Sequence, residues 1–263
     1  MSIQIEVVER MNHKGLDLGY GRSLAMVLCV VTMLWGCQDD TDQRLVESND
    51  AVLPLDVTRV VYLNRKGGIY TQSKDDDSAQ NTVSILDVAG PVELPPFDGT
   101  QDAWDATVAC VREQYAAYNI QFVEEEPDAL HMEIAVGGDR KDLGYLNNIQ
   151  GVAPQRVDCK PLENGIGFVF SSSAQINNDP ELACWAVAHE LGHVLGLEHS
   201  LHCDENMSYR SVCTHKHFLD RDLKCGDYTA GPCLCGGETQ NSHQHLLSYL
   251  GESKSVWSSH VKP

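Results

Sequence analysis

Apolar residues along the middle of the chain alternate between the spacing of strands and the spacing of helices. Short runs rich in Val, Ile, Tyr and Phe predict β-strands at residues 57–63, 119–126, 130–138 and 165–173. Between the first two runs an apolar residue recurs every three or four positions, which predicts an amphipathic helix packed on a sheet. The apolar positions of this helix are Trp104, Val108, Val111, Tyr115 and Tyr118.

A second helix has a defined start and end in the sequence. Asp179 can accept hydrogen bonds from the free amides of the first turn, Pro180 suits the first helical position, and Glu181 faces the positive end of the helix dipole. Gly196 can adopt the left-handed turn that ends a helix. Strand, helix, three strands and a second helix are the order expected of one compact α/β domain.

The remaining segments carry weaker patterns. Residues 67–99 hold much Pro, Asp and Ser and predict a loop with one short strand near residues 83–86. Residues 239–251 predict a last short helix, whose apolar face consists of Leu246, Leu247 and Leu250.

The first 37 residues do not fit the pattern of a folded domain. Arg22 precedes an apolar stretch, residues 24–34, that is too short for a stable bilayer anchor but suits the core of a signal peptide. The stretch ends in Leu-Trp-Gly-Cys, which resembles a bacterial lipoprotein signal and implies that Cys37 is the lipidated N-terminus of the mature chain. An ordinary secretory peptide is the alternative, and both predict export. The polar, acidic residues 38–55 then predict a tether.

Length and charge narrow the range of functions. The chain has 263 residues, enough for one domain with a substantial core, and a formal net charge of -19. This acidity argues against a nucleic-acid partner, because such binding needs Lys and Arg to neutralise phosphates. Two acidic runs, residues 75–77 and 124–126, are typical of solvated surface, and Ca²⁺ binding is the alternative for them.

The cysteines fit an oxidising compartment. Outside the leader there is an even set of them: Cys110, Cys159, Cys184, Cys203, Cys213, Cys225, Cys233 and Cys235. An even set in an exported chain predicts disulfides, and most of these cysteines crowd the segment 203–237. The competing interpretation is a zinc cluster of Cys225, Cys233 and Cys235 with His215 or His217, for which Cys-x-Cys spacing is poor.

Three histidines and a glutamate lie within one short stretch. His189 and His193 are four residues apart, so both side chains can point from one face of the second helix at a common ion. Gly196 permits the chain to reverse, and His199 then supplies a third nitrogen. Zinc favours nitrogen ligands in four-coordinate geometry, and a catalytic zinc keeps one position for water. Glu190 lies off the ligand line and can take a proton from that water.

This constellation, H-E-x-x-H-x-x-G-x-x-H followed by a methionine turn, resembles the metzincin metalloproteases. The resemblance implies a single catalytic Zn²⁺ bound by His189, His193 and His199, with Glu190 as the general base. It also implies that Met207 forms the hydrophobic floor beneath the metal. Ser200 and the short connection from His199 to Met207 are similar to those of matrixins.

The residue two positions after Met207 is similar to a feature of astacins and serralysins. In those families a tyrosine there reaches the zinc or the oxyanion, which implies that Tyr209 is a fifth ligand or a transition-state donor. A tyrosine packed below the site is the alternative. Other features of relatives are missing, since His131 stands alone where animal matrixins bind a structural zinc. No cysteine-switch pro-peptide is evident, and Cys159 is expected to be a disulfide partner.

The resemblance also implies a fold for residues 56–263. It is an α/β (α+β), metzincin-like zincin domain: a mixed twisted sheet, an active-site helix, a methionine turn and a C-terminal helix beneath that turn. In metzincins the strand before the active-site helix is the sheet edge that receives the substrate backbone, and residues 165–173 occupy that place.

The sequence therefore predicts an exported, monomeric zinc endopeptidase of the cell envelope or extracellular space that acts on protein or peptide substrates. A non-catalytic zinc-containing envelope binding protein and a peptidoglycan- or glycan-modifying metalloenzyme are the alternatives. Retention of Glu190 argues against the binding protein, because zinc binding alone does not need a base. The bend to His199 favours a peptide in the cleft over a glycan.

Overall fold

The computed structural model describes residues 53–86, 88–146, 149–172, 176–177, 179–210 and 215–254. The predicted signal peptide, Cys37, nearly all of the predicted tether and Cys213 lie outside these residues, so the division into leader, tether and domain stays a prediction. Among the residues that the structure describes, no helix is both long enough and apolar enough to cross a membrane.

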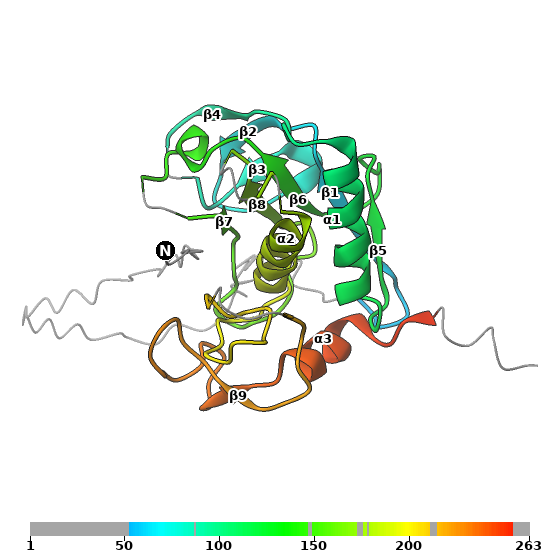
Figure 1. The fold of residues 1–263 in the computed structure, drawn as a ribbon, viewed down its shortest axis with the longest axis vertical. Coiled ribbons are helices and arrows are strands. Elements are labelled where there is room, and N and C mark those ends of the chain that lie inside the picture. The colour runs from blue at the N-terminus through cyan, green and yellow to red at the C-terminus, as the bar shows by residue number, and fades with distance from the viewer. Residues whose placement is uncertain are drawn as a thin grey trace, which may run out of the picture. The chain divides into compact units, whose positions relative to one another are not determined.

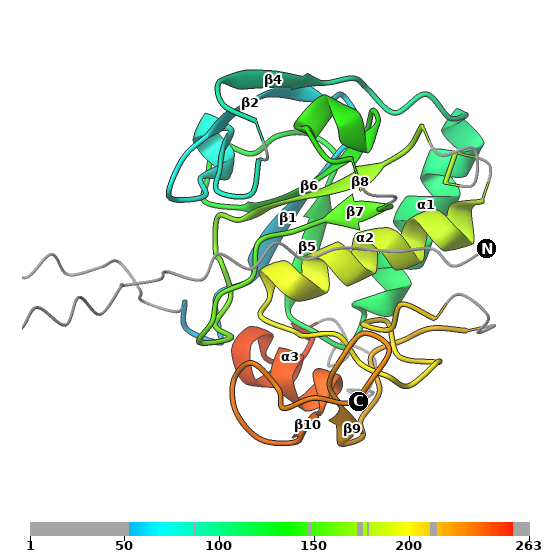
Figure 2. The ribbon, with the colours of Figure 1, turned by 90° about the vertical axis from the view of Figure 1, so that its left-hand side faces the viewer.

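A five-stranded mixed sheet forms the centre of the structure (Figures 1 and 2). Its strands lie in the order β5-β1-β6-β8-β7, in which β7 is antiparallel to β8 and the other neighbours are parallel. In the register, Leu63 pairs with Ile134, which in turn pairs with Gly167. The strands are β1 (Arg59–Asn64), β5 (Ile120–Val123), β6 (Met132–Gly137), β7 (Gly151–Val152) and β8 (Ile166–Phe170). The four strands predicted for this part of the chain are confirmed.

Helices cover one face of this sheet and a smaller sheet covers the other. Successive side chains of a strand point to opposite faces. Ile134 of β6 therefore lies in the main core with helices α1 (Gln101–Gln114) and α2 (Pro180–Val194), whereas Ala135 lies in a second core with the smaller sheet. In the same way, Val169 of β8 lies in the main core and Phe168 lies in the second core. Figure 2 shows the central sheet between these two layers.

The smaller sheet has three strands, β2 (Gly68–Gln72), β3 (Thr82–Val83) and β4 (Pro91–Leu94), in the order β3-β2-β4. One-turn 3-10 helices follow β2 and β6, at Ser78–Gln80 and Arg140–Leu143. The prediction of a loop with one short strand in this region is wrong for β2 and β4. Each of these two strands buries a single side chain, Tyr70 or Leu94, so neither shows the alternation that marks a strand in a sequence.

The edge of the central sheet is not the strand that the sequence indicates. Residues 165–173 were expected at the edge, but β8 lies between β6 and β7, and the edge strand on this side of the sheet is β7. A strand of two residues that begins with Gly151 leaves no periodic pattern to detect. A β-carbon on Gly151 would collide with the Glu190 carboxylate and the Phe168 carbonyl, so glycine lets this edge approach α2 closely.

Helix α2 begins and ends as predicted. The Asp179 carboxylate accepts a hydrogen bond from the Leu182 amide at 3.1 Å, and Pro180 is the first helical residue. After the helix, Gly196 has a φ of 90°, and a β-carbon there would collide with the Cys159 carbonyl. Only glycine fits this turn without displacing the neighbouring segment, which returns the chain across the helix end.

The C-terminal part of the chain packs against the main core, to which α2 also contributes. Strands β9 (Leu223–Lys224) and β10 (Thr239–Gln240) form an antiparallel pair, and helix α3 (Ser242–Leu250) follows. Leu246 and Leu250 lie in the main core and Leu247 packs against it, so the predicted apolar face is confirmed. A sheet, a helix that carries the histidine motif and a C-terminal helix confirm the predicted α/β class.

Disulfides account for the described cysteines. The pairs are Cys110–Cys184, Cys159–Cys235 and Cys225–Cys233, and Cys203 is also disulfide-bonded. The alternative of a zinc cluster built on Cys225, Cys233 and Cys235 is wrong, because these sulfurs are bonded to each other or to Cys159 and have no thiolate to offer. The disulfides fit an exported protein.

Candidate metal centre

Three buried histidines converge where α2 ends and the chain turns back. The Nε2 atom of His193 lies 3.0 Å from the Nε2 atom of His189 and 3.0 Å from that of His199. Three nitrogens bound to one tetrahedral metal at ordinary Zn–N distances would lie about 3.3 Å apart. The structure therefore brings the three predicted ligands together at a spacing that suits one ion, and the group could hold a metal.

The outer nitrogen of each ring, Nδ1, bonds an acceptor oxygen. The acceptors are the Asn206 carbonyl for His189 at 2.8 Å, the Leu197 carbonyl for His193 at 2.8 Å, and the Asp227 carboxylate for His199 at 2.7 Å. A proton held on Nδ1 leaves Nε2 as the atom with a free lone pair. Asp227 was not predicted, because it lies 28 residues beyond His199 and belongs to no local motif.

Burial keeps the first two histidines neutral. Desolvation lowers the pKa of His189 and His193 well below the usual range, and the neighbouring imidazoles add to this effect. The bond from His199 in turn lowers the pKa of Asp227. Neutral imidazoles beside an ionised carboxylate are the protonation states that a metal requires of such a group.

Glu190 follows His189 on α2 and is fully buried, and neither carboxylate oxygen has a hydrogen-bond partner among the described residues. Burial alone raises the pKa of this carboxyl well above its usual range. A buried carboxyl group without a partner is costly and calls for a polar group beside it. A water on a metal held by the three histidines is such a group, so the residues present fit a catalytic metal.

Met207 and Tyr209 lie on the segment that follows the third histidine. Met207 is fully buried, its carbonyl accepts from the Ser200 amide at 2.8 Å, and a β-carbon on Gly192 would collide with its sulfur. The Tyr209 ring lies 4.0 Å from the His199 ring between centroids. Of the two predicted residues, Tyr209 therefore contacts a histidine directly, whereas Met207 packs against Gly192 of α2, between the positions of His189 and His193.

Other candidate ligands do not join this group. His131 is buried and its Nδ1 bonds the Ala129 carbonyl at 2.8 Å. In the first acidic run, Asp76 accepts from Ser84, and in the second, Glu124 accepts from Trp104. In the part of the chain that the model describes, one further group has ligand-type spacing, Glu198 with Cys225 and Cys233, but its two cysteines form a disulfide.

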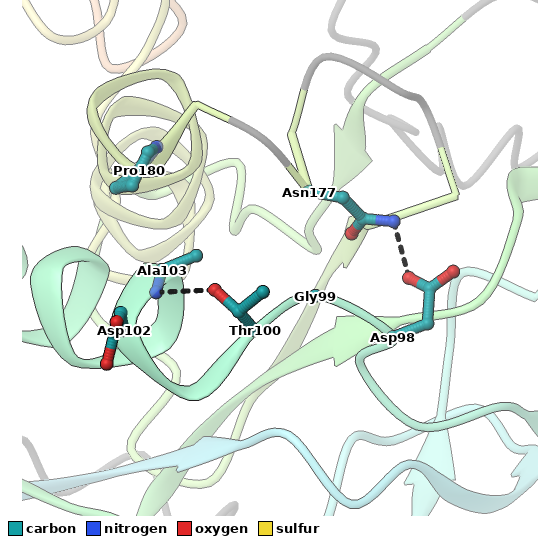
Figure 3. Close-up of a pocket in the computed structure, with 7 residues that line it drawn as sticks. All are labelled: Asp98, Gly99, Thr100, Asp102, Ala103, Asn177 and Pro180. Carbon is teal, nitrogen blue, oxygen red and sulfur yellow. Dashed lines mark hydrogen bonds between the residues drawn. The ribbon is translucent and has the colours of Figure 1, made fainter.

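A separate cavity of about 480 Å³ lies where the N-termini of α1 and α2 meet (Figure 3). Thr100 accepts from the Ala103 amide on one side, and Asn177 donates to Asp98 on the other. Its lining consists of Asp98, Gly99, Thr100, Asp102, Ala103, Asn177 and Pro180. None of the predicted site residues lines this cavity.

No protein-family model matches the sequence, and no curated protein matches it. Among solved structures, the fold is similar to metalloproteinase-II from Bacteroides fragilis, with a TM-score of 0.35 and 13% sequence identity over 61% of this chain. The match spans about half of that protein, 49% of its chain.

Proposed function

We propose that the protein is a zinc-dependent endopeptidase. Two observations on α2 and its turn carry this proposal. The Nε2 atoms of three buried imidazoles converge, and the buried carboxylate of Glu190, the residue after His189, has no hydrogen-bond partner among the described residues. Imidazole also suits copper, iron and nickel. Zinc is favoured because three nitrogen ligands with a position left for water are its usual catalytic arrangement.

The residues divide the chemistry of amide hydrolysis among them. Zinc held by the three histidines would polarise the substrate carbonyl and make a water molecule more acidic. Glu190 would be the general base that accepts a proton from water and delivers it to the departing amine. The raised pKa of Glu190 suits a group that must hold a proton between these two steps.

Edge strand β7 supports a peptide substrate. It pairs with β8 on one side and is the last strand of the sheet on the other, so an extended peptide can add to it through backbone hydrogen bonds. Gly151 brings this strand against Glu190. A peptide paired with β7 would therefore run past the general base, which is the requirement for cleavage within a chain. A glycan would not use the edge in this way.

The proposal also covers where the enzyme acts and on which substrates. The disulfides support export. The proposed enzyme is a monomer that is held at the envelope through a lipid on Cys37 or released from it. Its substrates would be unstructured segments of extracellular or envelope proteins. Tyr209 would donate to the transition state from beside His199, and Ca²⁺ at the acidic runs would have a structural role only.

The test compares the oxidised wild-type protein with Glu190→Gln and, as a matched control on the same helix, Glu181→Gln. All three proteins should bind zinc, as measured by elemental analysis. The wild type and the control should cleave casein in a chelator-sensitive way, and Glu190→Gln should lose at least about 100-fold in rate. Bound zinc without cleavage by the wild type would favour the non-catalytic binding protein. A wild type that binds no metal would contradict the metal centre itself.

A further inference from the structure

The segment 225–233 is a small loop closed by the Cys225–Cys233 disulfide, and it is called the disulfide loop below. Its turn is fixed from within: the Gly231 amide donates to the Cys225 carbonyl at 3.0 Å. Gly226 has a φ of 128°, and a β-carbon there would collide with the Thr229 carbonyl. The loop therefore has little freedom to change shape.

This loop contacts the third histidine at both its backbone and its side chain. The Gly226 amide donates to the His199 carbonyl at 3.0 Å, and the next residue, Asp227, bonds the His199 ring at 2.7 Å. One step further along, the Leu201 amide donates to the Lys224 carbonyl at 3.2 Å. The segment that carries His199 is thus paired with the start of the disulfide loop.

His199 needs such support more than the other two histidines do. His189 and His193 are held by α2, and their outer nitrogens bond backbone carbonyls. His199 follows the Gly196 turn, outside any helix or strand, and its outer nitrogen bonds a side chain instead. The Asp227 side chain is itself 58% exposed, so burial does not hold it in place.

A second contact places the disulfide loop at the same site. Tyr228, next to Asp227, stacks on Tyr209 with 5.8 Å between ring centroids and 28° between ring planes. Tyr209 in turn lies against His199. Of these two consecutive residues, Asp227 therefore contacts His199 directly and Tyr228 reaches it through Tyr209.

We infer that Asp227 is a positioning residue for His199 and that the disulfide loop presents it. This inference rests on the proposed metal centre. The Asp227 carboxylate accepts the Nδ1 proton, which directs the Nε2 lone pair at the metal position and fixes the plane of the ring. The disulfide holds Asp227 in register with His199 although the residue lies on an exposed turn.

The experiment measures Zn²⁺ dissociation constants of the full, oxidised chain by competition with a chromogenic chelator. Asp227→Ala should weaken zinc binding by about 10- to 100-fold. Asp227→Asn, which keeps an acceptor oxygen without the charge, should recover part of this loss. Asp222→Ala removes another exposed carboxylate, three residues before the loop, and should leave the constant unchanged. Equal zinc affinity of Asp227→Ala and the wild type would overturn the inference, as would an equal loss in Asp222→Ala.

A second arm tests the role of the disulfide. Replacement of both Cys225 and Cys233 by alanine should weaken zinc binding in the wild type but add little to the loss in Asp227→Ala, because both changes act through one contact. Fully additive losses would overturn this part. The two levels of proposal fail differently: a wild type without zinc affinity contradicts the proposed function, whereas unchanged affinity in Asp227→Ala contradicts the positioning role alone.

Discussion

At the scale of single residues, the outer hydrogen bonds decide what the three histidines can do. An imidazole offers a lone pair to a metal from only one nitrogen, and its partner at the other nitrogen selects which one. Here every partner is an oxygen at 2.7 to 2.8 Å, so all three rings present Nε2 to the same point. The histidine group is therefore arranged in advance for a ligand that needs three nitrogen donors.

Tyr209 has two possible roles, packing against His199 through its ring or stabilising the transition state through its hydroxyl. Tyr209→Phe keeps the ring that lies against His199 and Tyr228 and removes only the hydroxyl. If the hydroxyl stabilises the transition state, kcat should fall by about 100-fold with the zinc dissociation constant unchanged. The measurement is steady-state casein cleavage beside zinc competition. An unchanged kcat would assign Tyr209 to packing, and a weaker zinc affinity would instead make it a ligand.

Glu205, two residues before Met207, should make the stability of the fold depend on pH. This carboxyl is fully buried, and desolvation raises its pKa from 4.5 to about 7 against the hydrogen bonds that it accepts. Lys216 is the cation that faces it. The folded state holds the proton more tightly than the unfolded chain, so the stability that protonation provides is present below pH 4.5 and is lost as the pH rises to about 7.

The comparison with Glu205→Gln isolates this effect. Between pH 4.5 and pH 7 the free energy of unfolding of the wild type should fall by about 3 kcal/mol relative to Glu205→Gln. Urea unfolding of both zinc-saturated proteins across this range measures the difference, and any pH dependence of zinc binding cancels between them. A difference that does not vary with pH would show that the carboxyl titrates normally.

At the scale of elements, signals that lie within a few residues were readable from the sequence and signals that depend on distant segments were not. Helix α2 carries its cap, its two ligands and its terminating glycine in one stretch, so its bounds and its ligands could be predicted. Strand β7 becomes the edge only because β8 pairs with it, and two residues carry no period. Asp227 reaches His199 only through the disulfide loop, and no sequence spacing encodes that pairing.

The turn at Gly196 connects α2, which carries His189 and His193, to the segment that carries His199. Gly196→Ala places a β-carbon against the Cys159 carbonyl at a φ of 90°, which should cost about 1–3 kcal/mol of stability. Relief of this collision shifts the segment that carries His199, so zinc affinity should fall as well. Gly231→Ala is the matched control, because no atom lies within 4 Å of its β-carbon and its φ is not in the left-handed region. Denaturant unfolding and zinc competition on both variants test this, and equal behaviour would contradict it.

At the scale of the whole molecule, the disulfides divide into two kinds. Cys110–Cys184 joins α1 to α2 across a sequence separation of 74 residues, whereas Cys225–Cys233 closes a separation of 8. A cross-link stabilises mainly by restricting the unfolded chain, and this restriction grows with the length of the closed segment. The long cross-link should therefore serve stability, and the short one should serve the geometry of the site.

Paired alanine substitutions separate these two contributions. In metal-free protein, loss of Cys110–Cys184 should lower the free energy of unfolding by about 4 kcal/mol and loss of Cys225–Cys233 by about 2.5 kcal/mol, from chain entropy alone. Zinc affinity should follow the opposite order, because only the short cross-link lies beside Asp227. Metal-free samples are essential, since zinc bound to the folded state would add its own stabilisation. If the loss of zinc affinity followed the loss of stability in both variants, the disulfide loop would be a general clamp and not a part of the metal centre.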